Sequence, residues 1–195
     1  MVNTSMPVFL ASGSAQRRIL LEQLGLHVAA QYAPDVDERH LPNESLSDYV
    51  RRVTRLKADA GQRHFVQGCI VAADTAMSLH GQVIGKPHDG DDAIAMLLQL
   101  SGHTHKVMTA VSVVGVRGIL DIVVETEVTF RELSFAEAKA YWQTGEPAGK
   151  AGSYALQGRG AQFVTQIKGS PSAVIGLPLA ETAMLLRQQG IDPLA

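Results

Sequence analysis

Cysteine is almost absent from this chain, since Cys69 is the one cysteine among 195 residues. A single thiol cannot form an internal disulfide, and it excludes the cysteine-rich patterns of zinc sites and of thioredoxin-like redox sites. Cys69 lies in an apolar stretch with Ile70 and Val71, and a free thiol in such a stretch suits the reducing cytoplasm. We therefore expect a cytoplasmic protein that needs no disulfide.

Charged residues are also few, at 18% of the chain, and 17 Lys and Arg against 19 Asp and Glu give a formal net charge of −2. Without a basic excess the chain cannot displace many counterions from a polynucleotide, so a nucleic-acid polymer is disfavoured as a partner. Small anions need only a few local cations and stay possible ligands. A hydrophobic fraction of 46% with so few charges excludes intrinsic disorder.

Long hydrophobic runs are missing as well. No run approaches the roughly 20 residues of a membrane-spanning helix, so we expect no membrane partner. The apolar run Pro7–Ala11 is too short for the core of a signal peptide and has no basic region before it, which favours a first strand. Met6 is an alternative start. We therefore expect residues 1–5 to be an extension and residues 6–193 to be a single domain.

Apolar periodicity and turn residues divide the chain into short helices and strands. Strands are predicted at Pro7–Ala11, Cys69–Ala73, Lys106–Val116, Ile119–Phe130, Gln162–Ile167 and Ala173–Ile175, with a hairpin at Ala76–Lys86 that turns at His80-Gly81. Helices are predicted at Arg17–Leu24, Ser45–His64, Asp91–Leu100 and Ser134–Gly145, and from Pro178 to Gly190. Helices alternate with strands that later pair antiparallel, which predicts an α/β fold with a mixed sheet.

The turn Ser12-Gly13-Ser14 connects the first strand to the first helix. A strand, a turn of small residues and a helix start form a common phosphate-binding geometry, because free N–H groups and the positive end of the helix dipole attract anions. Ser12 and Ser14 are expected to donate hydrogen bonds to phosphate. They are not expected to act as nucleophiles, since the sequence places no His or acid to activate them.

Lys57 is out of place in the long helix, because it falls about 40° from Val53, inside the apolar stripe. The stripe consists of Leu46, Tyr49, Val50, Val53, Leu56 and Ala60. Lys57 either covers apolar surface with its stem or directs its ammonium into a cleft, and position alone does not separate these alternatives.

Asp74 directly follows the apolar run 69–73, so we expect it at the carboxyl end of a buried strand, the edge where open α/β sheets bind ligands. Capping or turn formation together with Thr75 is the alternative. Lys86 closes the adjacent hairpin and by itself would be an exposed turn residue. An acidic loop contains Asp35, Asp37 and Glu38, which are either simply solvated or, with Asp74, part of a site for a magnesium-type ion.

Two further segments are polar or rich in glycine. Residues 149–161 contain four glycines, which predict either a hairpin or tight turns that approach a ligand, and Gln157 within them could read a base edge. His103 and His105 alternate as in a strand. A third metal ligand is missing there, so we expect both imidazoles on the surface.

Seven of these features occur in the order that is typical of the Maf family of nucleotide pyrophosphatases, which the chain resembles over nearly its whole length. The segments that carry the resemblance are Leu10–Arg18, Asp35–Glu38, Lys57-Ala58, Ala73–Thr75, Gly85–Pro87, Lys150–Gly158 and Val174–Leu179. One departure is that the family usually has Ser-Pro-Arg-Arg where this chain has Ser14-Ala15-Gln16-Arg17-Arg18. Arg17 aligns with the second Arg of the family motif.

The resemblance implies an α/β fold with a mixed twisted sheet, flanking helices and two lobes around a central cleft, of the Maf/ITPase-like type. It implies a cytoplasmic homodimer that cleaves nucleoside triphosphates to the monophosphate and pyrophosphate with a divalent cation, Mg²⁺ or Mn²⁺. The family is associated with the house-cleaning of non-standard nucleotides, and Thr75 and Gln157 match the residues of its branch that acts on dTTP and UTP. The alternatives are activity on 7-methyl-GTP or another modified nucleotide, and a non-catalytic role as a nucleotide-binding regulator of septum formation.

The resemblance also assigns roles to single residues. Asp74 would be the general base, with Lys57 and Lys86 as further catalytic residues, and Glu38 and Asp74 would bind the metal. The residues expected to bind substrate are Ser12, Ser14, Arg17, Arg18, Thr75 and Gln157. Several convergent cations are needed because a nucleoside triphosphate carries a charge of about −4.

Overall fold

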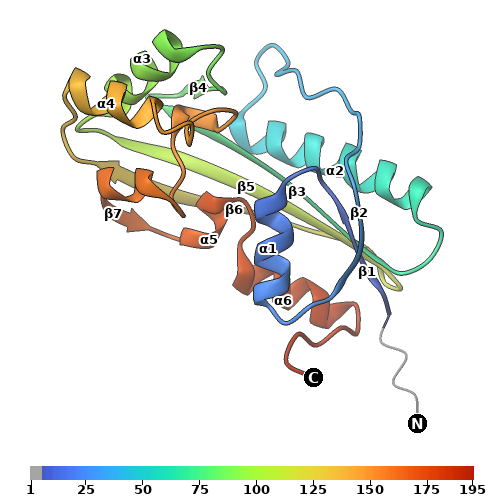
Figure 1. Ribbon diagram of the computed structural model, residues 1–195. Helices are drawn as coiled ribbons and strands as arrows, with labels where there is room; N and C mark the ends of the chain where they lie inside the picture. The colour runs from blue at the N-terminus through green and yellow to red at the C-terminus, as the bar shows by residue number, and fades with distance from the viewer. Residues whose placement is uncertain (1–5) are drawn as a thin grey trace. The chain divides into compact units, whose positions relative to one another are not determined.

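Residues 6–195 are the part of the chain that the structure, a computed structural model, describes, and within them seven strands form one mixed sheet. The strands are β1 (Val8–Ala11), β2 (Val28–Tyr32), β3 (Cys69–Leu79), β4 (Gln82–Ile84), β5 (Thr104–Gly115), β6 (Gly118–Phe130) and β7 (Val164–Lys168). The order is β2-β1-β3-β5-β6-β7, with β4 paired to β3 (Figure 1). This confirms the predicted α/β fold with a mixed sheet.

Six α-helices and two short 3₁₀ helices are present in the same residues, 6–195. They are α1 (Ala15–Gln23), α2 (Leu46–His64), α3 (Gly90–Leu100), α4 (Phe135–Trp142), α5 (Pro171–Ile175) and α6 (Leu179–Gln188), with η1 (Ala151–Ser153) and η2 (Arg159–Phe163). Ser14, Ser45 and Ser134 cap α1, α2 and α4, because each hydroxyl accepts a hydrogen bond from a backbone N–H of the first turn. None of the described helices has the length and apolar character that a membrane span requires.

The described chain divides into two compact units. Unit 1 comprises residues up to 75 together with 109–124 and 176–195, and unit 2 comprises residues 76–108 and 125–175. Strands β3, β5 and β6 contribute residues to both. The expectation of a single domain over residues 6–193 stays a prediction, and the extension expected at residues 1–5 lies outside the described part.

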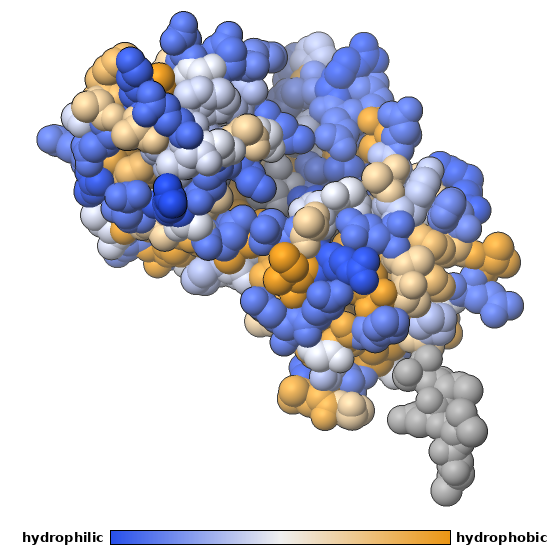
Figure 2. Space-filling view, in the orientation of Figure 1, coloured by the Kyte–Doolittle hydropathy of each residue, from blue (hydrophilic) through white to orange (hydrophobic). Residues whose placement is uncertain are grey.

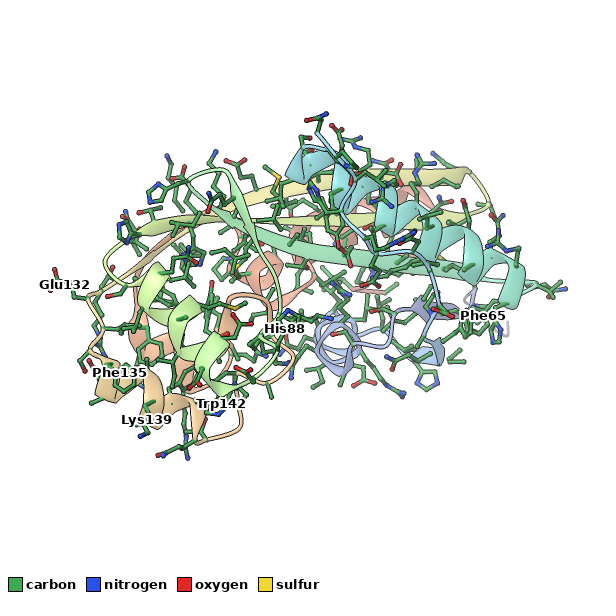
Figure 3. The ribbon with its side chains drawn as sticks, turned by 90° about the horizontal axis from the view of Figure 1, so that it is seen from above. Phe65, His88, Glu132, Phe135, Lys139 and Trp142 are labelled. Carbon is green, nitrogen blue, oxygen red and sulfur yellow. The ribbon has the colours of Figure 1, made fainter. Side chains whose placement is uncertain are left out.

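In unit 1, β1 pairs in parallel with β2 on one side and with β3 on the other. The two connections through α1 and α2 therefore run in opposite directions along the sheet, and right-handed crossovers place their helices on opposite faces. Figures 1 and 3 show α1 and α2 on opposite faces of the sheet. Helix α1, which follows the turn after β1, and the long helix α2 therefore lie on opposite faces of the sheet beside β1 and β3.

Helix α2 packs closely on β1 and β3 at Gly61. An added Cβ on Gly61 would lie 2.7 Å from the Cβ of Ala11 and 2.9 Å from the Cγ2 of Ile70, so any larger residue would push the helix away from the sheet. Ala58, also on this face, is fully buried with Ala11 and Ile70 in one hydrophobic cluster. This close approach lets Lys57, one helical turn before Gly61, reach the strands.

The carboxyl end of α6 closes unit 1 over the β5–β6 hairpin. The buried Gln189 side chain accepts a hydrogen bond from the N–H of Arg117 (2.9 Å) and donates one to the carbonyl of Gly118 (2.9 Å). A buried amide that pairs with both backbone groups of a turn stabilises the turn.

Unit 2 has its own hydrophobic core. Its buried members include Met77, Leu97, Val107, Val128, Phe130, Leu133, Tyr141, Tyr154 and Phe163. Helices α3 and α4 pack at Gly90, where an added Cβ would lie 2.5 Å from Nε1 of Trp142, and Figure 3 shows Trp142 on α4 beside α3.

The glycine-rich segment of unit 2 forms η1 and η2, so the predicted hairpin alternative is wrong. Glu146 organises this segment, because its carboxylate accepts hydrogen bonds from Tyr141 Oη (2.5 Å) and from the N–H groups of Arg159 and Gly160 (3.0 Å each). Local turn propensity indicated tight turns here, but the carboxylate that holds them lies outside the segment.

Three other elements differ from the prediction, one in length, one in type and one because it was missed. The strand predicted at Cys69–Ala73 continues as β3 to Leu79, because Asp74 and Thr75 keep extended backbone between two apolar stretches. The segment Ala173–Ile175 is helical and belongs to α5. Strand β2 was not predicted, because only its first residue, Val28, is buried and the strand lacks an apolar run.

Hydrophilic side chains predominate on the face shown in Figure 2, where the hydrophobic areas are small and interrupted. His103 is exposed, as predicted. His105 is buried in the core of unit 2, at 1% exposure, which corrects its assignment to the surface. The alternation places it on the face of β5 that packs against Phe130 and Tyr154.

Candidate active site

The buried face of α2 carries a lysine. Its buried residues are Val50, Val53, Thr54, Lys57, Ala58 and Gly61. They recur at the spacing of one helix face, and Lys57 stands in the middle of this face. Leu56, which was predicted in the stripe, is 36% exposed. The true apolar face is rotated from the predicted one, toward Lys57.

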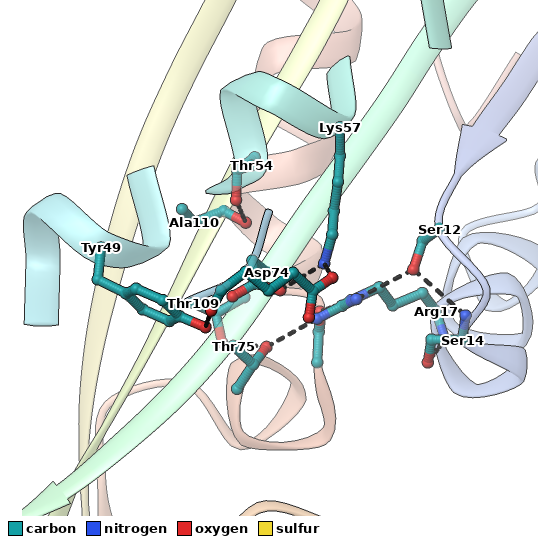
Figure 4. A network of polar contacts seen from close by, with 12 residues as sticks. Ser12, Ser14, Arg17, Tyr49, Thr54, Lys57, Asp74, Thr75, Thr109 and Ala110 are labelled. Atoms are coloured by element: carbon teal, nitrogen blue, oxygen red, sulfur yellow. Dashed lines mark hydrogen bonds and ion pairs between the residues drawn. The ribbon is translucent and has the colours of Figure 1, made fainter. Parts of the chain in front are cut away.

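Two carboxylates meet the ammonium of Lys57. Its Nζ lies 2.6 Å from Oδ1 of Asp74 and 2.7 Å from Oε1 of Glu38. The side chains of Lys57 and Asp74 are only 8% and 10% exposed, whereas Glu38 is 44% exposed. Figure 4 shows Lys57 reaching from α2 toward Asp74 on β3. The ammonium of Lys57 is buried and paired, so the side chain is not a stem that covers surface with its charge in water. Its role in a ligand site stays a prediction.

Asp74 lies in the middle of β3 and not at its end. The last residue pair between β1 and β3 is Leu10 with Val71, so β3 runs on past the point where β1 stops. The turn that begins at Ser12 follows β1 directly. Strand β1 is shorter than β3, so Asp74 lies beyond the last residue pair of the two strands. The predicted polar site at a strand end is therefore at the end of β1 and in the middle of β3.

Arg17, in the first turn of α1, forms the second half of the cluster. Its Nε donates to the carbonyl of Gly176 (2.9 Å), Nη1 to Oγ of Ser12 (3.0 Å), and Nη2 to Oγ1 of Thr75 (3.1 Å). The hydroxyl of Thr75 also lies 3.0 Å from that of Thr109. The guanidinium thus joins the turn after β1, strand β3 and the segment before α6 (Figure 4).

The serines of the turn support this arrangement. The Ser14 hydroxyl caps α1 and accepts from the N–H of Arg17 at 3.4 Å, and the N–H of Ser14 donates to Oγ of Ser12 at 3.3 Å. Ser12 is buried. The helix start therefore lies beside a buried guanidinium, which is an arrangement that attracts an anion.

The cluster combines three buried charged side chains, Arg17, Lys57 and Asp74, with the half-exposed carboxylate of Glu38. Burial lowers the pKa of Arg17, and the carboxylates of Asp74 and Glu38 act in the opposite direction. Tyr49 on α2 belongs to the same environment. Burial, followed by Asp74 and Glu38, raises the pKa of Tyr49 to about 12, so its hydroxyl stays a donor at neutral pH.

One predicted site residue of unit 1, Arg18, lies apart from this cluster. Arg18 is exposed and pairs with Glu22 at 2.9 Å, four residues along the same helix. Lys86 and Gln157 belong to unit 2, where both are exposed.

The sequence did not identify Tyr49, Thr109 or Gly176 as parts of the site. Tyr49 lies on the same helix as Lys57 and gave only an apolar signal. Thr109 gave none, and Gly176 appeared only within the segment Val174–Leu179 that carries the family resemblance. Both residues are far along the chain and reach the cluster only through the fold.

The donor set decides which metal would fit. Among the described residues no group of three or more His, Cys, Asp or Glu side chains could hold a metal ion by itself. Glu38 and Asp74 nevertheless place two carboxylates on one ammonium. Magnesium typically takes one or two carboxylates together with substrate phosphate oxygens. The residues fit an ion of that kind, which is bound jointly with a phosphorylated ligand.

The chain is also similar to known proteins over most of its length. The model of the family described as Maf-like protein matches residues 7–189. A protein of Anaeromyxobacter dehalogenans named dTTP/UTP pyrophosphatase is 54% identical over 188 residues, covering 93% of each chain. Proteins of the same name from Pseudoalteromonas translucida and Cupriavidus pinatubonensis are 47% and 46% identical and cover 92% and 93% of this chain and 95% and 96% of their own.

Proposed function

The chain belongs to the family of Maf-like proteins, and on this premise we propose that it is a nucleoside triphosphate pyrophosphatase that hydrolyses dTTP and UTP to the monophosphate and pyrophosphate. The observation that carries the proposal is the buried ammonium of Lys57 between Asp74 and Glu38. Buried charges are costly to maintain, so a cluster that also has a helix start beside it is more easily explained by chemistry than by stability.

The cationic residues bind the triphosphate in this proposal. Arg17 and Lys57 supply the positive charge in unit 1, and the hydroxyl of Ser12 and the N–H groups at the start of α1 donate to phosphate oxygens. Arg17 already makes three hydrogen bonds within the protein, so its position is fixed before the anion arrives. A fixed donor loses little entropy on binding and costs little reorganisation.

Asp74 is the general base. Its carboxylate orients a water molecule and removes its proton as the water attacks phosphorus, and the bond between the α- and β-phosphates breaks to release pyrophosphate. Lys57 holds the carboxylate in place through the 2.6 Å contact. The same ammonium lies beside the phosphates and offsets negative charge that develops in the transition state.

Glu38 and Asp74 would hold the divalent cation, Mg²⁺ or Mn²⁺. When bound, the cation neutralises charge on the leaving pyrophosphate. Both carboxylates contact Lys57, so the ammonium arranges the two metal ligands as well as the base.

Base selection is assigned to Thr75 and Gln157, and Lys86 is added to the triphosphate-binding cations, on the family resemblance. The hydroxyl of Thr75 accepts a hydrogen bond from Arg17. A change at position 75 is therefore expected to disturb phosphate binding as well as the choice of base.

A substrate panel tests the proposed function. The purified protein is incubated with Mg²⁺ and each of dTTP, UTP, CTP, ATP, GTP and 7-methyl-GTP, and pyrophosphate release is measured. We expect the highest kcat/KM for dTTP and UTP. A higher value for 7-methyl-GTP would assign the protein to the other branch of the family. No turnover of any of them would contradict the proposal and leave nucleotide binding in cell division as the function to test.

We further propose a cytoplasmic homodimer. The free thiol of Cys69 is buried, and burial raises its pKa to about 12, so no reactive thiolate is present at neutral pH. The dimer rests on the family resemblance alone. Light scattering after gel filtration at micromolar concentration measures it, and a monomer mass at all concentrations would exclude it.

A further inference from the structure

Glu38 is placed on a segment without regular secondary structure. We call residues 35–44 the acidic loop, and none of them belongs to a helix or strand. The side chain of Glu38 is 44% exposed, yet its carboxylate lies 2.7 Å from the buried Nζ of Lys57. A half-exposed side chain on an irregular loop loses conformational entropy when it is fixed. Something other than the ion pair must therefore hold the loop backbone.

Tyr49 holds the loop at Glu38 itself. Its Oη donates to the main-chain carbonyl of Glu38 at 3.0 Å. Tyr49 lies two helical turns before Lys57 on α2, so one helix holds both the backbone and the side chain of Glu38. The ring of Tyr49 also packs against His40 of the loop, with centroids 5.2 Å apart.

Arg52 holds the loop on both sides of Glu38. Its Nη1 donates to the carbonyl of Asp37 (3.3 Å) and Nη2 to the carbonyl of Arg39 (2.8 Å). The same guanidinium binds the carboxylate of Glu44 through Nε (2.6 Å) and Nη2 (2.9 Å). Its central carbon lies 5.7 Å from the ring centroid of Tyr49. Three consecutive loop carbonyls, at positions 37, 38 and 39, are therefore bound by two neighbouring side chains of α2.

We propose that Tyr49 and Arg52 are positioning residues, which fix the backbone of the acidic loop so that the carboxylate of Glu38 stands beside Lys57 and Asp74. That Tyr49 and Arg52 fix the backbone of the acidic loop does not depend on the enzyme's activity. Its consequence for catalysis rests on the proposed function, in which Glu38 is a metal ligand. Partners that orient a metal ligand typically change metal affinity or activity by about 10-fold to 100-fold when they are removed.

Limited proteolysis tests the backbone part without any assay of activity. Trypsin can cleave after Arg39, within the loop, and mass spectrometry follows the release of that fragment. Tyr49→Phe and Arg52→Met are expected to be cleaved there several-fold faster than the wild type. Tyr32→Phe, in the same unit, and Arg51→Met, next to Arg52 but exposed, are the matched controls and should match the wild type. Equal cleavage of all five proteins would overturn the proposal.

Kinetics test the catalytic part. In Tyr49→Phe the Mg²⁺ concentration for half-maximal rate is expected to rise about tenfold, while KM for dTTP at saturating Mg²⁺ changes less than about twofold. Arg52→Met should raise the Mg²⁺ concentration for half-maximal rate in the same way, and Arg52→Lys should raise it less. A lysine reaches one of the acceptors but cannot bind both oxygens of Glu44. A parallel rise in KM with an unchanged Mg²⁺ dependence would contradict a role through Glu38.

A double-mutant cycle decides whether Tyr49 acts through Glu38. If it does, Glu38→Gln with Tyr49→Phe should be no slower than Glu38→Gln alone. Multiplied losses would overturn the proposal, as would a Glu38→Gln variant with unchanged Mg²⁺ dependence. A wild-type protein that turns over no nucleotide would contradict the proposed function instead, and the proteolysis comparison would still decide the positioning.

Discussion

Lys57 with Asp74 in unit 1 and His105 with Tyr154 in unit 2 are both buried polar pairs, but only the first pair is ionic. Nε2 of His105 lies 2.9 Å from Oη of Tyr154, and Nδ1 has no hydrogen-bond partner among the described residues. Burial lowers the pKa of His105 to about 4, so the pair is neutral at pH 7. In the core of unit 2 the ionisable group has given up its charge, which is the usual response to burial.

In the cluster of unit 1, by contrast, the ammonium of Lys57 lies within hydrogen-bond distance of the carboxylates of Asp74 and Glu38. Arg17 adds a third buried ionic group, with three hydrogen bonds to neutral acceptors. Such a cluster contributes little to stability compared with apolar packing. Unit 2 therefore buries a polar pair as part of its core, whereas unit 1 holds paired charges at the proposed substrate site.

The largest expected effect is on catalysis, from Asp74→Asn. The amide keeps the shape of the side chain but cannot take a proton, so kcat for dTTP should fall about 10²-fold to 10⁴-fold. Initial rates of pyrophosphate release measure it. Asp59→Asn, the same change on α2, is the control and should keep the wild-type rate. Full activity of Asp74→Asn would remove the assignment of the base.

Lys57→Met tests how far the free energy of unfolding falls when the ion pair with Asp74 is broken. The variant leaves Asp74 buried without its ammonium, and the free energy of unfolding is expected to fall by about 3 kcal/mol, as measured by urea denaturation. Adding Asp74→Asn should recover part of this loss, because the buried charge is then gone. Strictly additive losses would mean that the two residues do not act as a pair.

The pH dependence of stability tests whether His105 in unit 2 is buried as a neutral imidazole. His105 has a pKa of about 4 in the folded protein against 6.5 ordinarily. Its contribution is therefore complete above pH 6.5 and is lost as the pH falls toward 4, by up to about 3 kcal/mol. Urea midpoints between pH 7 and 4 should fall more steeply in the wild type than in His105→Phe. The same slope in both proteins would contradict the buried neutral imidazole.

The smallest effect is expected from Arg18→Ala, although the family resemblance places Arg18 in the substrate-binding set. Its partner Glu22 and Arg18 itself are exposed, so stability should change by about 0.5 kcal/mol or less and KM for dTTP by less than about twofold. Arg17→Ala, the neighbouring residue, should raise KM strongly. Equal increases in KM for both variants would return Arg18 to the binding set.

Much of the fold could be predicted from local signals. Serine caps marked the starts of α2 and α4, and turn residues marked the β5–β6 hairpin. The cap of α1, Ser14, was not recognised as one, and the helix begins two residues before the predicted Arg17. The failures at β2 and α5 have a common reason. Both elements are five residues long, which is too short to show an apolar periodicity. Their conformation is determined by packing against neighbouring elements rather than by local propensity.

For the candidate site, the sequence identified Lys57 because it falls inside an apolar stripe and Asp74 because it directly follows an apolar run. The side chains that surround these two residues could not be predicted from such patterns. Tyr49 belongs to the stripe by its position, and only its hydroxyl, directed at the carbonyl of Glu38, gives it a place in the site. Hydroxyls and carbonyls leave no periodic signal in a sequence.

The sequence by itself determined where most helices begin, which strands are buried, which residues interrupt an apolar face, and the family to which the chain belongs. The first three properties depend on residues within one or two turns of each other, so a local pattern contains them. The family follows from the order of seven short segments along the chain. Only the tertiary structure decided that Glu38 and Asp74 share one ammonium, and that Arg17 meets the carbonyl of Gly176. Such contacts depend on strand order and on the path of loops between distant positions, which periodicity does not encode.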